Sequence, residues 1–216
     1  MVTVDNAALR DWIAETRLVA IIRGTDVDQT VQTALTLIDA GVTTLEITLT
    51  LAEAEQAIAQ VVQDAPAGAL IGAGTVLSES DVDRSISAGA QFIVTPTLTA
   101  SVPYAVRSGI GVLPGVFTPT EVQQGMDSGV AAVKLFPAAS LGPGFLRAVR
   151  DPFPDARIIP VGGVGLETIP SYLAAGAFGV GIGGPLVGDA AQPGGDLNAL
   201  AVRAADFVAA TAQGAH

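Results

Sequence analysis

The stretch LVAIIRGTDVDQTVQTALTLIDAGVTTLEITLT, residues 18–50, predicts a strand, a helix and a second strand. The runs LVAIIR (18–23) and TTLEITLT (43–50) are β-branched, apolar and of strand length. The segment DVDQTVQTALTLIDAG (26–41) between them begins after a residue type that caps helices and ends in Ala-Gly, a common helix stop. Strand, helix and strand in this order favour a parallel βαβ unit.

The same alternation continues along the chain. Six further strands are expected at ALIGAGTV (69–76), QFIVTPT (91–97), GVLPGVF (111–117), AAVKLFP (131–137), RIIPVGG (157–163) and FGVGIGG (178–184). Eight units at roughly 25-residue spacing, after a helix around residues 5–16, favour an α/β fold of the (β/α)8 TIM-barrel type. A doubly wound open sheet is the structural alternative. No linker divides the chain, so we expect a single barrel domain over residues 1–216.

The composition excludes several kinds of chemistry. The chain has no cysteine, and its single histidine is the terminal His216, where disorder or a tag is expected. We therefore expect no thiolate or histidine catalysis and no metal site. The stretch GAGTVL (72–77) departs from a dinucleotide fingerprint because Leu77 stands at the third glycine position, so no cofactor is expected.

The charge narrows the expected partners. A formal net charge of −11 argues against nucleic-acid binding and against docking on anionic membranes. No apolar run is long enough to span a bilayer. The first residues lack the basic and apolar regions of a secretory signal, so a cytoplasmic protein is expected.

Side-chain alternation directs a few charged groups into the barrel. In TTLEITLT, Leu45, Ile47 and Leu49 share the face that must pack against helices, so Glu46 points into the lumen. In AAVKLFP the same rule sends Lys134, the only lysine in the chain, inward. Arg23 ends the first strand, at the barrel edge where active sites form.

A lysine in a confined, partly apolar place is suited to covalent chemistry. A neutral amine can attack a ketone to form a Schiff base, which then accepts electrons from a breaking carbon–carbon bond. Glu46 could move the protons, and Arg23 could hold a substrate carboxylate by a two-pronged hydrogen bond. The alternative is structural: a Lys–Glu pair that plugs the lumen and a salt-bridged arginine at its rim, although burying such charges is costly.

Two glycine-rich turns predict an anion site. VGGVG (161–165) follows the seventh strand and GIGGP (181–185) follows the eighth. Backbone N–H groups at such turns and at the helices after them can hold a phosphate. The same glycines could equally serve tight turns alone.

Seven motifs together give a family resemblance over roughly residues 18–187. They are VAIIRG, LEITLT, IGAGTVL, FIVTPTLT, LPGVFTPTE, VKLFPA and VGGV. In this order they resemble the 2-keto-3-deoxy-6-phosphogluconate (KDPG) aldolase family. That family includes 4-hydroxy-2-oxoglutarate (KHG) and 2-keto-3-deoxy-6-phosphogalactonate (KDPGal) aldolases. The resemblance implies a cofactor-free class I aldolase on a (β/α)8 barrel that releases pyruvate from a small keto acid and assembles as a homotrimer.

The resemblance also implies roles for particular residues. It makes Lys134 the Schiff-base lysine and Glu46 the proton shuttle. The residues it implies for substrate binding are Arg23, Thr75, Pro96, Phe136, Gly162, Gly163, Gly183 and Gly184. There are departures: some members have an arginine where this chain has Thr50, and the late Gly-Ser that helps hold phosphate is Gly183-Gly184 here.

The expected function is the cleavage of a 2-keto-3-deoxy sugar acid, KDPG first, to pyruvate and glyceraldehyde 3-phosphate. The VGGV and FPAASLGPGF stretches look more like the galactonate branch, so KDPGal and KHG remain alternative substrates. More distant alternatives are a phosphate-binding barrel isomerase or synthase without a covalent intermediate, and a barrel that binds anions without turnover.

Overall fold

A computed structural model describes residues 3–212 of the chain. The strands are β1 (Leu18–Ile22), β2 (Thr44–Thr48), β3 (Leu70–Gly74), β4 (Phe92–Val94), β5 (Gly111–Leu113), β6 (Gly115–Val116), β7 (Val133–Leu135), β8 (Ile158–Pro160) and β9 (Val180–Ile182). Each of the eight predicted strands is confirmed, with shorter bounds. His216 lies outside the described residues.

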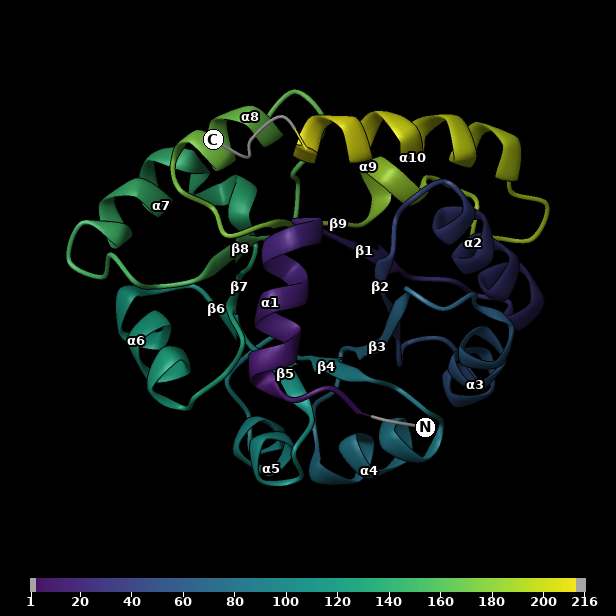
Figure 1. The fold of residues 1–216 in the computed structure, drawn as a ribbon, viewed down its shortest axis with the longest axis horizontal. Coiled ribbons are helices and arrows are strands. Elements are labelled where there is room, and N and C mark those ends of the chain that lie inside the picture. The colour runs from purple at the N-terminus through teal and green to yellow at the C-terminus, as the bar shows by residue number, and fades with distance from the viewer. Residues whose placement is uncertain (1–2, 213–216) are drawn as a thin grey trace.

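All the helices except the first surround the strands as an outer layer, and the first lies across one end of the barrel (Figure 1). The helices are α1 (Asn6–Thr16), α2 (Val27–Asp39), α3 (Ala54–Asp64), α4 (Glu79–Ser87), α5 (Ser101–Arg107), α6 (Pro119–Asp127), α7 (Gly142–Arg150), α8 (Ile169–Ala174), α9 (Gly184–Val187) and α10 (Leu197–Ala212), with a 3-10 turn, η1, at Ala138–Ser140. Polar side chains cap three of these helices: those of Asp26, Ser78 and Thr118 accept hydrogen bonds from N–H groups in the first turns of α2, α4 and α6.

The strands close into a barrel, so the open-sheet alternative is wrong. All paired strands are parallel, in two runs with the orders β5-β4-β3-β2-β1-β9 and β6-β7-β8. An isolated bridge between Val161 and Gly181 joins the β8 and β9 sides. At the other junction only Pro114 separates β5 from β6, so one predicted strand serves both runs. Proline has no N–H to donate to a ladder, which explains the break at this point.

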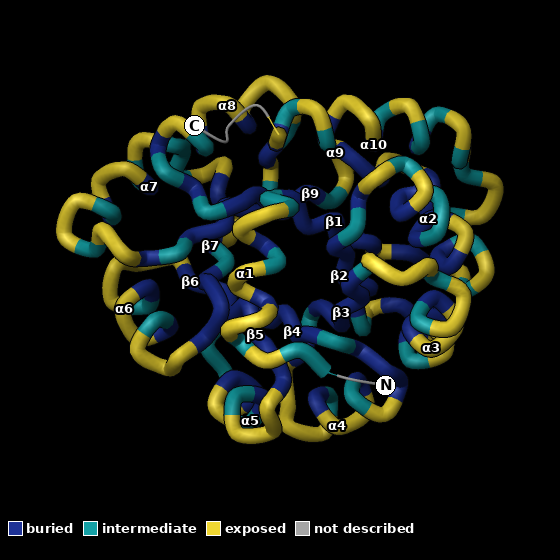
Figure 2. Tube along the Cα trace, in the orientation of Figure 1, coloured by how far each residue is buried: buried dark blue, intermediate teal, exposed yellow. Residues whose placement is uncertain are grey.

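Two apolar layers lie on the two sides of the strands. Leu45 and Ile47 of β2, with Val133 and Leu135 of β7, belong to the large cluster between strands and helices. A smaller cluster fills the lumen, and it takes the alternate residues of the strands, such as Ala132. The alternation predicted for both strands is thereby confirmed. Figure 2 shows burial along the strands and exposure on the outer helix faces.

Helix α1 closes one end of the barrel (Figure 1). Its Leu9 and Ile13 complete the lumen cluster. The Asn6 side-chain oxygen accepts hydrogen bonds from the backbone N–H groups of Val112 and Ala131, both at 2.9 Å. These contacts lie at the amino-terminal ends of strands. The carboxyl-terminal end is therefore the end left for a ligand.

Candidate active site

Lys134 of β7 and Glu46 of β2 meet inside the barrel. The Nζ atom of Lys134 lies 3.5 Å from Oε1 of Glu46. The lysine side chain is 12% exposed and the glutamate side chain 1%. The structure thus brings together the two residues that strand alternation sent into the lumen, and only the lysine has access to solvent.

Burial dominates the electrostatics of Glu46. Removal from water raises the pKa of its carboxyl above the usual value, and the charge and hydrogen bond of Lys134 and the charge of Arg23 oppose the rise only in part. Within residues 3–212, its Oε2 atom is buried without a hydrogen-bond partner. A carboxylate with a raised pKa is a stronger base, which suits a group that collects and returns protons.

The surroundings of the pair are apolar. A small cavity beside Glu46 and Lys134 is lined by Val19, Ile21, Val94, Leu113, Ile159, Val161 and Gly181. On the solvent side, the Phe136 ring centroid lies 5.6 Å from Nζ of Lys134, and the residue is 40% exposed. The Lys134 amine is therefore surrounded by aliphatic side chains toward the barrel interior and by the Phe136 ring toward solvent.

Thr75 immediately follows β3 and has an uncommon backbone conformation. Its φ angle is 58°, in the left-handed region that β-branched residues avoid. Holding a residue there costs about 1–3 kcal/mol, and the surrounding structure must supply it. Thr75 is partly buried and lies at the carboxyl-terminal end of the barrel.

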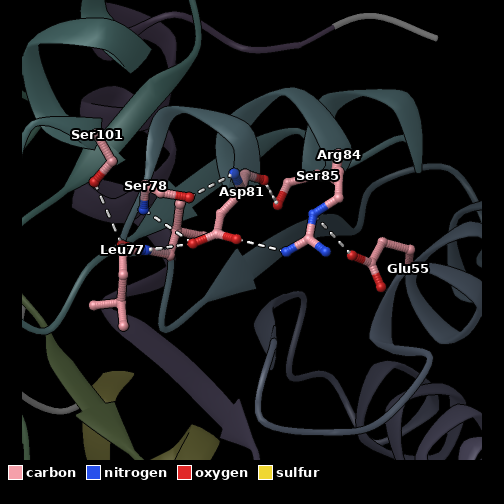
Figure 3. A network of polar contacts seen from close by, with 8 residues as sticks. Glu55, Leu77, Ser78, Asp81, Arg84, Ser85 and Ser101 are labelled. Atoms are coloured by element: carbon pink, nitrogen blue, oxygen red, sulfur yellow. Dashed lines mark hydrogen bonds and ion pairs between the residues drawn. The ribbon is translucent and has the colours of Figure 1, made fainter.

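A polar network anchors the loop that follows Thr75 (Figure 3). One oxygen of Asp81 accepts hydrogen bonds from the backbone N–H groups of Leu77 and Ser78. Its other oxygen accepts from Arg84, which also reaches Glu55 of α3 at 3.5 Å. Sequence reasoning missed this network, whose signal was the Ser-x-x-Asp spacing of a capping box.

Arg23 is the first residue after β1 and is exposed. Its backbone oxygen accepts a hydrogen bond from the Gln192 side chain at 3.3 Å. No ion pair of its guanidinium appears among residues 3–212, and its charge lowers the pKa of Glu46. Arg23 thus lies at the rim of the barrel, close enough to Glu46 for its charge to act on the carboxyl group.

The four late glycines follow β8 and β9, shortly after the bridge between Val161 and Gly181 that joins these strands. Gly162 and Gly163 have φ angles of 91° and 75°, which favour glycine. A methyl group on Gly162 would lie 3.0 Å from the Phe136 ring. Gly184 begins the short helix α9, and a methyl group there would meet nothing within 4 Å.

Pro96 is the last of the predicted site residues. Pro96, after β4, is half-buried, and its carbonyl group would clash with a methyl group on Gly115, so the two backbones pack closely. Residues 3–212 contain no group of three or more His, Cys, Asp and Glu placed to hold a metal ion. Among the helices of this part of the chain, none has the length and apolarity needed to cross a membrane.

A parallel eight-stranded barrel with a lysine and a buried carboxylate in its lumen defines a class of enzyme that makes and breaks bonds next to a carbonyl. The family model of KDPG and KHG aldolase matches residues 9–201. The chain therefore belongs to this aldolase family, and it is a lyase.

Individual relatives agree with the family. The chain is 36% identical over 201 residues to 2-dehydro-3-deoxy-6-phosphogalactonate aldolase of Escherichia coli (strain K12), which covers 92% of this chain and 96% of that one. A solved structure described as native KDPGal matches with a TM-score of 0.84 and 35% identity, over 91% of this chain and 95% of that one. A KDPG aldolase from Legionella pneumophila, with pyruvate captured at low pH as a covalent carbinolamine intermediate, matches with a TM-score of 0.81 and 27% identity, over 94% and 97%.

Proposed function

We propose that the protein is a class I aldolase in which Lys134 cleaves a 2-keto-3-deoxy sugar acid to pyruvate and an aldehyde. The observation that carries the proposal is the contact between Lys134 and Glu46 inside the barrel. The only lysine of the chain has its Nζ 3.5 Å from a glutamate oxygen in an apolar barrel interior. That arrangement supplies a nucleophile and a proton acceptor within reach of one substrate carbon.

The first half of the reaction forms the Schiff base. Glu46 first takes a proton from the Lys134 ammonium, and the neutral amine attacks the C2 ketone. Glu46 gives this proton to the C2 oxygen, takes a second proton from the nitrogen of the adduct, and gives that one to the C2 hydroxyl group. Water leaves, and a protonated imine between C2 and Nζ remains. The raised pKa of Glu46 makes its carboxylate a stronger base for the steps in which it takes a proton.

The second half breaks the carbon chain. Glu46, acting through water, removes the proton of the C4 hydroxyl, the C3–C4 bond breaks, and its electron pair moves into the C2–N system as an enamine. The aldehyde departs. The enamine takes a proton at C3, water adds to C2, and pyruvate leaves with Lys134 restored to an amine.

The remaining site residues hold the substrate. Arg23 and Thr75 orient the carboxylate next to C2, and Pro96 and Phe136 shape the pocket around the reacting carbons. Backbone N–H groups at Gly162, Gly163, Gly183 and Gly184 hold the phosphate at the other end. The exposed guanidinium of Arg23, for which residues 3–212 supply no ion-pair partner, and the left-handed backbone of Thr75 support these assignments.

KDPG is the first substrate candidate, with glyceraldehyde 3-phosphate as the aldehyde. KDPGal is the second, and the 36% identity to the Escherichia coli phosphogalactonate aldolase over nearly the whole chain favours it specifically. The two substrates are epimers at C4, so the wall near the C4 hydroxyl decides between them. KHG is the third candidate and lacks the phosphate.

A pyruvate-release assay with both C4 epimers and with KHG tests the proposal. We expect release from at least one substrate, and a loss on the order of 10⁴-fold or more in kcat for Lys134→Arg. The variant keeps the charge and should keep the circular dichroism spectrum of the parent. Normal turnover by Lys134→Arg would contradict the Schiff-base mechanism and favour a non-covalent isomerase or synthase. Ligand-induced stabilisation without any pyruvate would indicate a barrel that only binds anions.

Assembly, organisation and location complete the proposal. We propose one domain over residues 1–216, a homotrimer and a cytoplasmic location, supported by the family membership. Large apolar side chains stand exposed in loops after β3, β6, β7 and β8, as surfaces between subunits require: Leu77, Phe117, Phe136 and Leu166. Light scattering should give about three times the chain mass of 21.7 kDa. A monomer mass would refute the trimer.

A further inference from the structure

The carboxyl group of Glu46 rests directly against Gly74, the last residue of β3. A methyl group added to Gly74 would lie 2.5 Å from Oε2 of Glu46, 2.7 Å from Cδ and 3.2 Å from Oε1. Real side-chain carbons do not approach other atoms so closely in packed interiors. The side chain of Glu46 therefore occupies the space that any other residue at position 74 would need.

Backbone conformation does not explain the glycine. Gly74 lies in a strand and does not have a left-handed φ angle. Its neighbour on the same face of β3, Gly72, would place a methyl group 2.5 Å from the Phe92 ring. The two glycines thus leave room for different groups: Gly72 for an aromatic ring, and Gly74 for the carboxyl group.

The carboxyl group has no good alternative position. Glu46 is 1% exposed, and the cavity beside it is otherwise lined by Lys134, aliphatic side chains and Gly181. Within residues 3–212, Oε2 already lacks a hydrogen-bond partner. A methyl group at position 74 would have to push the carboxyl group off its present place beside Nζ of Lys134.

We propose that Gly74 is a positioning residue, whose missing side chain sets where the Glu46 carboxyl group stands relative to Lys134. The inference rests on the proposed function, since it assigns Gly74 to the proton transfers of that reaction. Gly74 has no side chain that could react, but it contacts the carboxyl group that does. It acts through Glu46 alone, so its effects should depend on the length of the side chain at position 46.

The test is a double-substitution cycle with Gly74→Ala, Glu46→Asp and the two combined. Gly74→Ala should lower kcat by on the order of 10²-fold, with a smaller change in KM, because it displaces a proton-transfer group. Aspartate is one methylene shorter and retreats from the added methyl group. Glu46→Asp should therefore cost about tenfold less in the Gly74→Ala background than in the parent. Additive effects would overturn the inference.

Gly72→Ala is the matched control, on the same strand and the same face. It should lower the melting temperature through Phe92 while keeping kcat per folded molecule and the parent pH profile of kcat. In Gly74→Ala, by contrast, the pH profile of kcat should be shifted along the pH axis relative to the parent. If Gly74→Ala does not fold, the combined variant should fold, because the clash is with the longer carboxyl side chain. Failure of both to fold would overturn the inference.

Trapping of pyruvate on the parent protein by borohydride separates this inference from the proposed function. Without an adduct on the parent, the Schiff-base account fails. With an adduct on the parent and unchanged kcat in Gly74→Ala, the proposed function stands and the role of Gly74 is wrong.

Discussion

Lys134 and Glu46 reach each other across the lumen from opposite sides of the barrel, and their charged atoms are 3.5 Å apart. The glutamate is the more deeply buried of the two. An ion pair with one fully buried partner is a poor source of stability, because desolvation offsets much of the attraction. The arrangement suits proton exchange with a substrate that enters from the lysine side.

Glu46→Gln should separate Schiff-base formation from cleavage. The amide has the shape of the carboxyl group but cannot accept a proton, so kcat should fall by about 10²–10⁴-fold. The variant should still form a borohydride-stable pyruvate adduct, more slowly than the parent. Steady-state kinetics and mass spectrometry on the same preparation check both parts. Parent-like kcat would remove Glu46 from the mechanism.

The same substitution should change how stability depends on pH. The pKa of Glu46 is raised in the folded state above the usual 4.5, so the folded protein holds this proton more tightly than the unfolded chain. The contribution is fully present below the unfolded pKa and is lost as pH rises through the folded pKa. The unfolding free energy of Glu46→Gln relative to the parent should therefore increase with pH above 4.5. Urea titrations that give parallel curves would contradict this.

The contribution of Asp81 to folding stability should have the opposite pH dependence. Burial alone would raise its pKa, but hydrogen bonds from Leu77, Ser78 and Arg84 outweigh it and hold the pKa below the usual 3.8. Its contribution is present above the unfolded pKa and is lost as pH falls through the folded one. Asp81→Ala should cost about 0.5–1.5 kcal/mol for each hydrogen bond lost at neutral pH, and less in acid. Asp28→Asn, an exposed acid in the first turn of α2, is the control and should have little effect.

Asn6 should matter for stability and not for chemistry. Its side-chain oxygen accepts hydrogen bonds from the backbone N–H groups of Val112 and Ala131 at the amino-terminal end of the barrel, away from the site. Asn6→Ala leaves these two donors without a partner and should cost about 1–3 kcal/mol for each donor that water does not reach. Asn6→Asp keeps the acceptor and should cost less. A large loss of kcat in folded Asn6→Ala would show that α1 influences the site.

Strand alternation predicted the barrel and the central pair of its site. A period of two in residues 43–50 is enough to send Glu46 inward, because Leu45 and Ile47 must pack on helices. The same rule placed Lys134. The break at Pro114 had a signal too, since proline interrupts a ladder, but which strands pair on either side of it depends on closure of the whole barrel.

Contacts between side chains and glycines of neighbouring strands could not be predicted from the sequence. The glycines of GAGT are visible, yet only the folded barrel shows that Gly74 faces the Glu46 carboxyl group and Gly72 faces Phe92. The φ angle of Thr75 is also invisible, because local preference opposes it and tertiary contacts impose it. The geometry of a site thus depends on packing that local sequence patterns do not encode.

The most direct test of the account is reduction with borohydride in the presence of excess pyruvate, followed by intact and peptide mass spectrometry. Since Lys134 is the only lysine, the account predicts one reduced pyruvate adduct per chain, on the peptide that contains residues 131–137, and none on Lys134→Arg. A folded parent protein that forms no adduct, or forms it on another peptide, would contradict the Schiff-base mechanism.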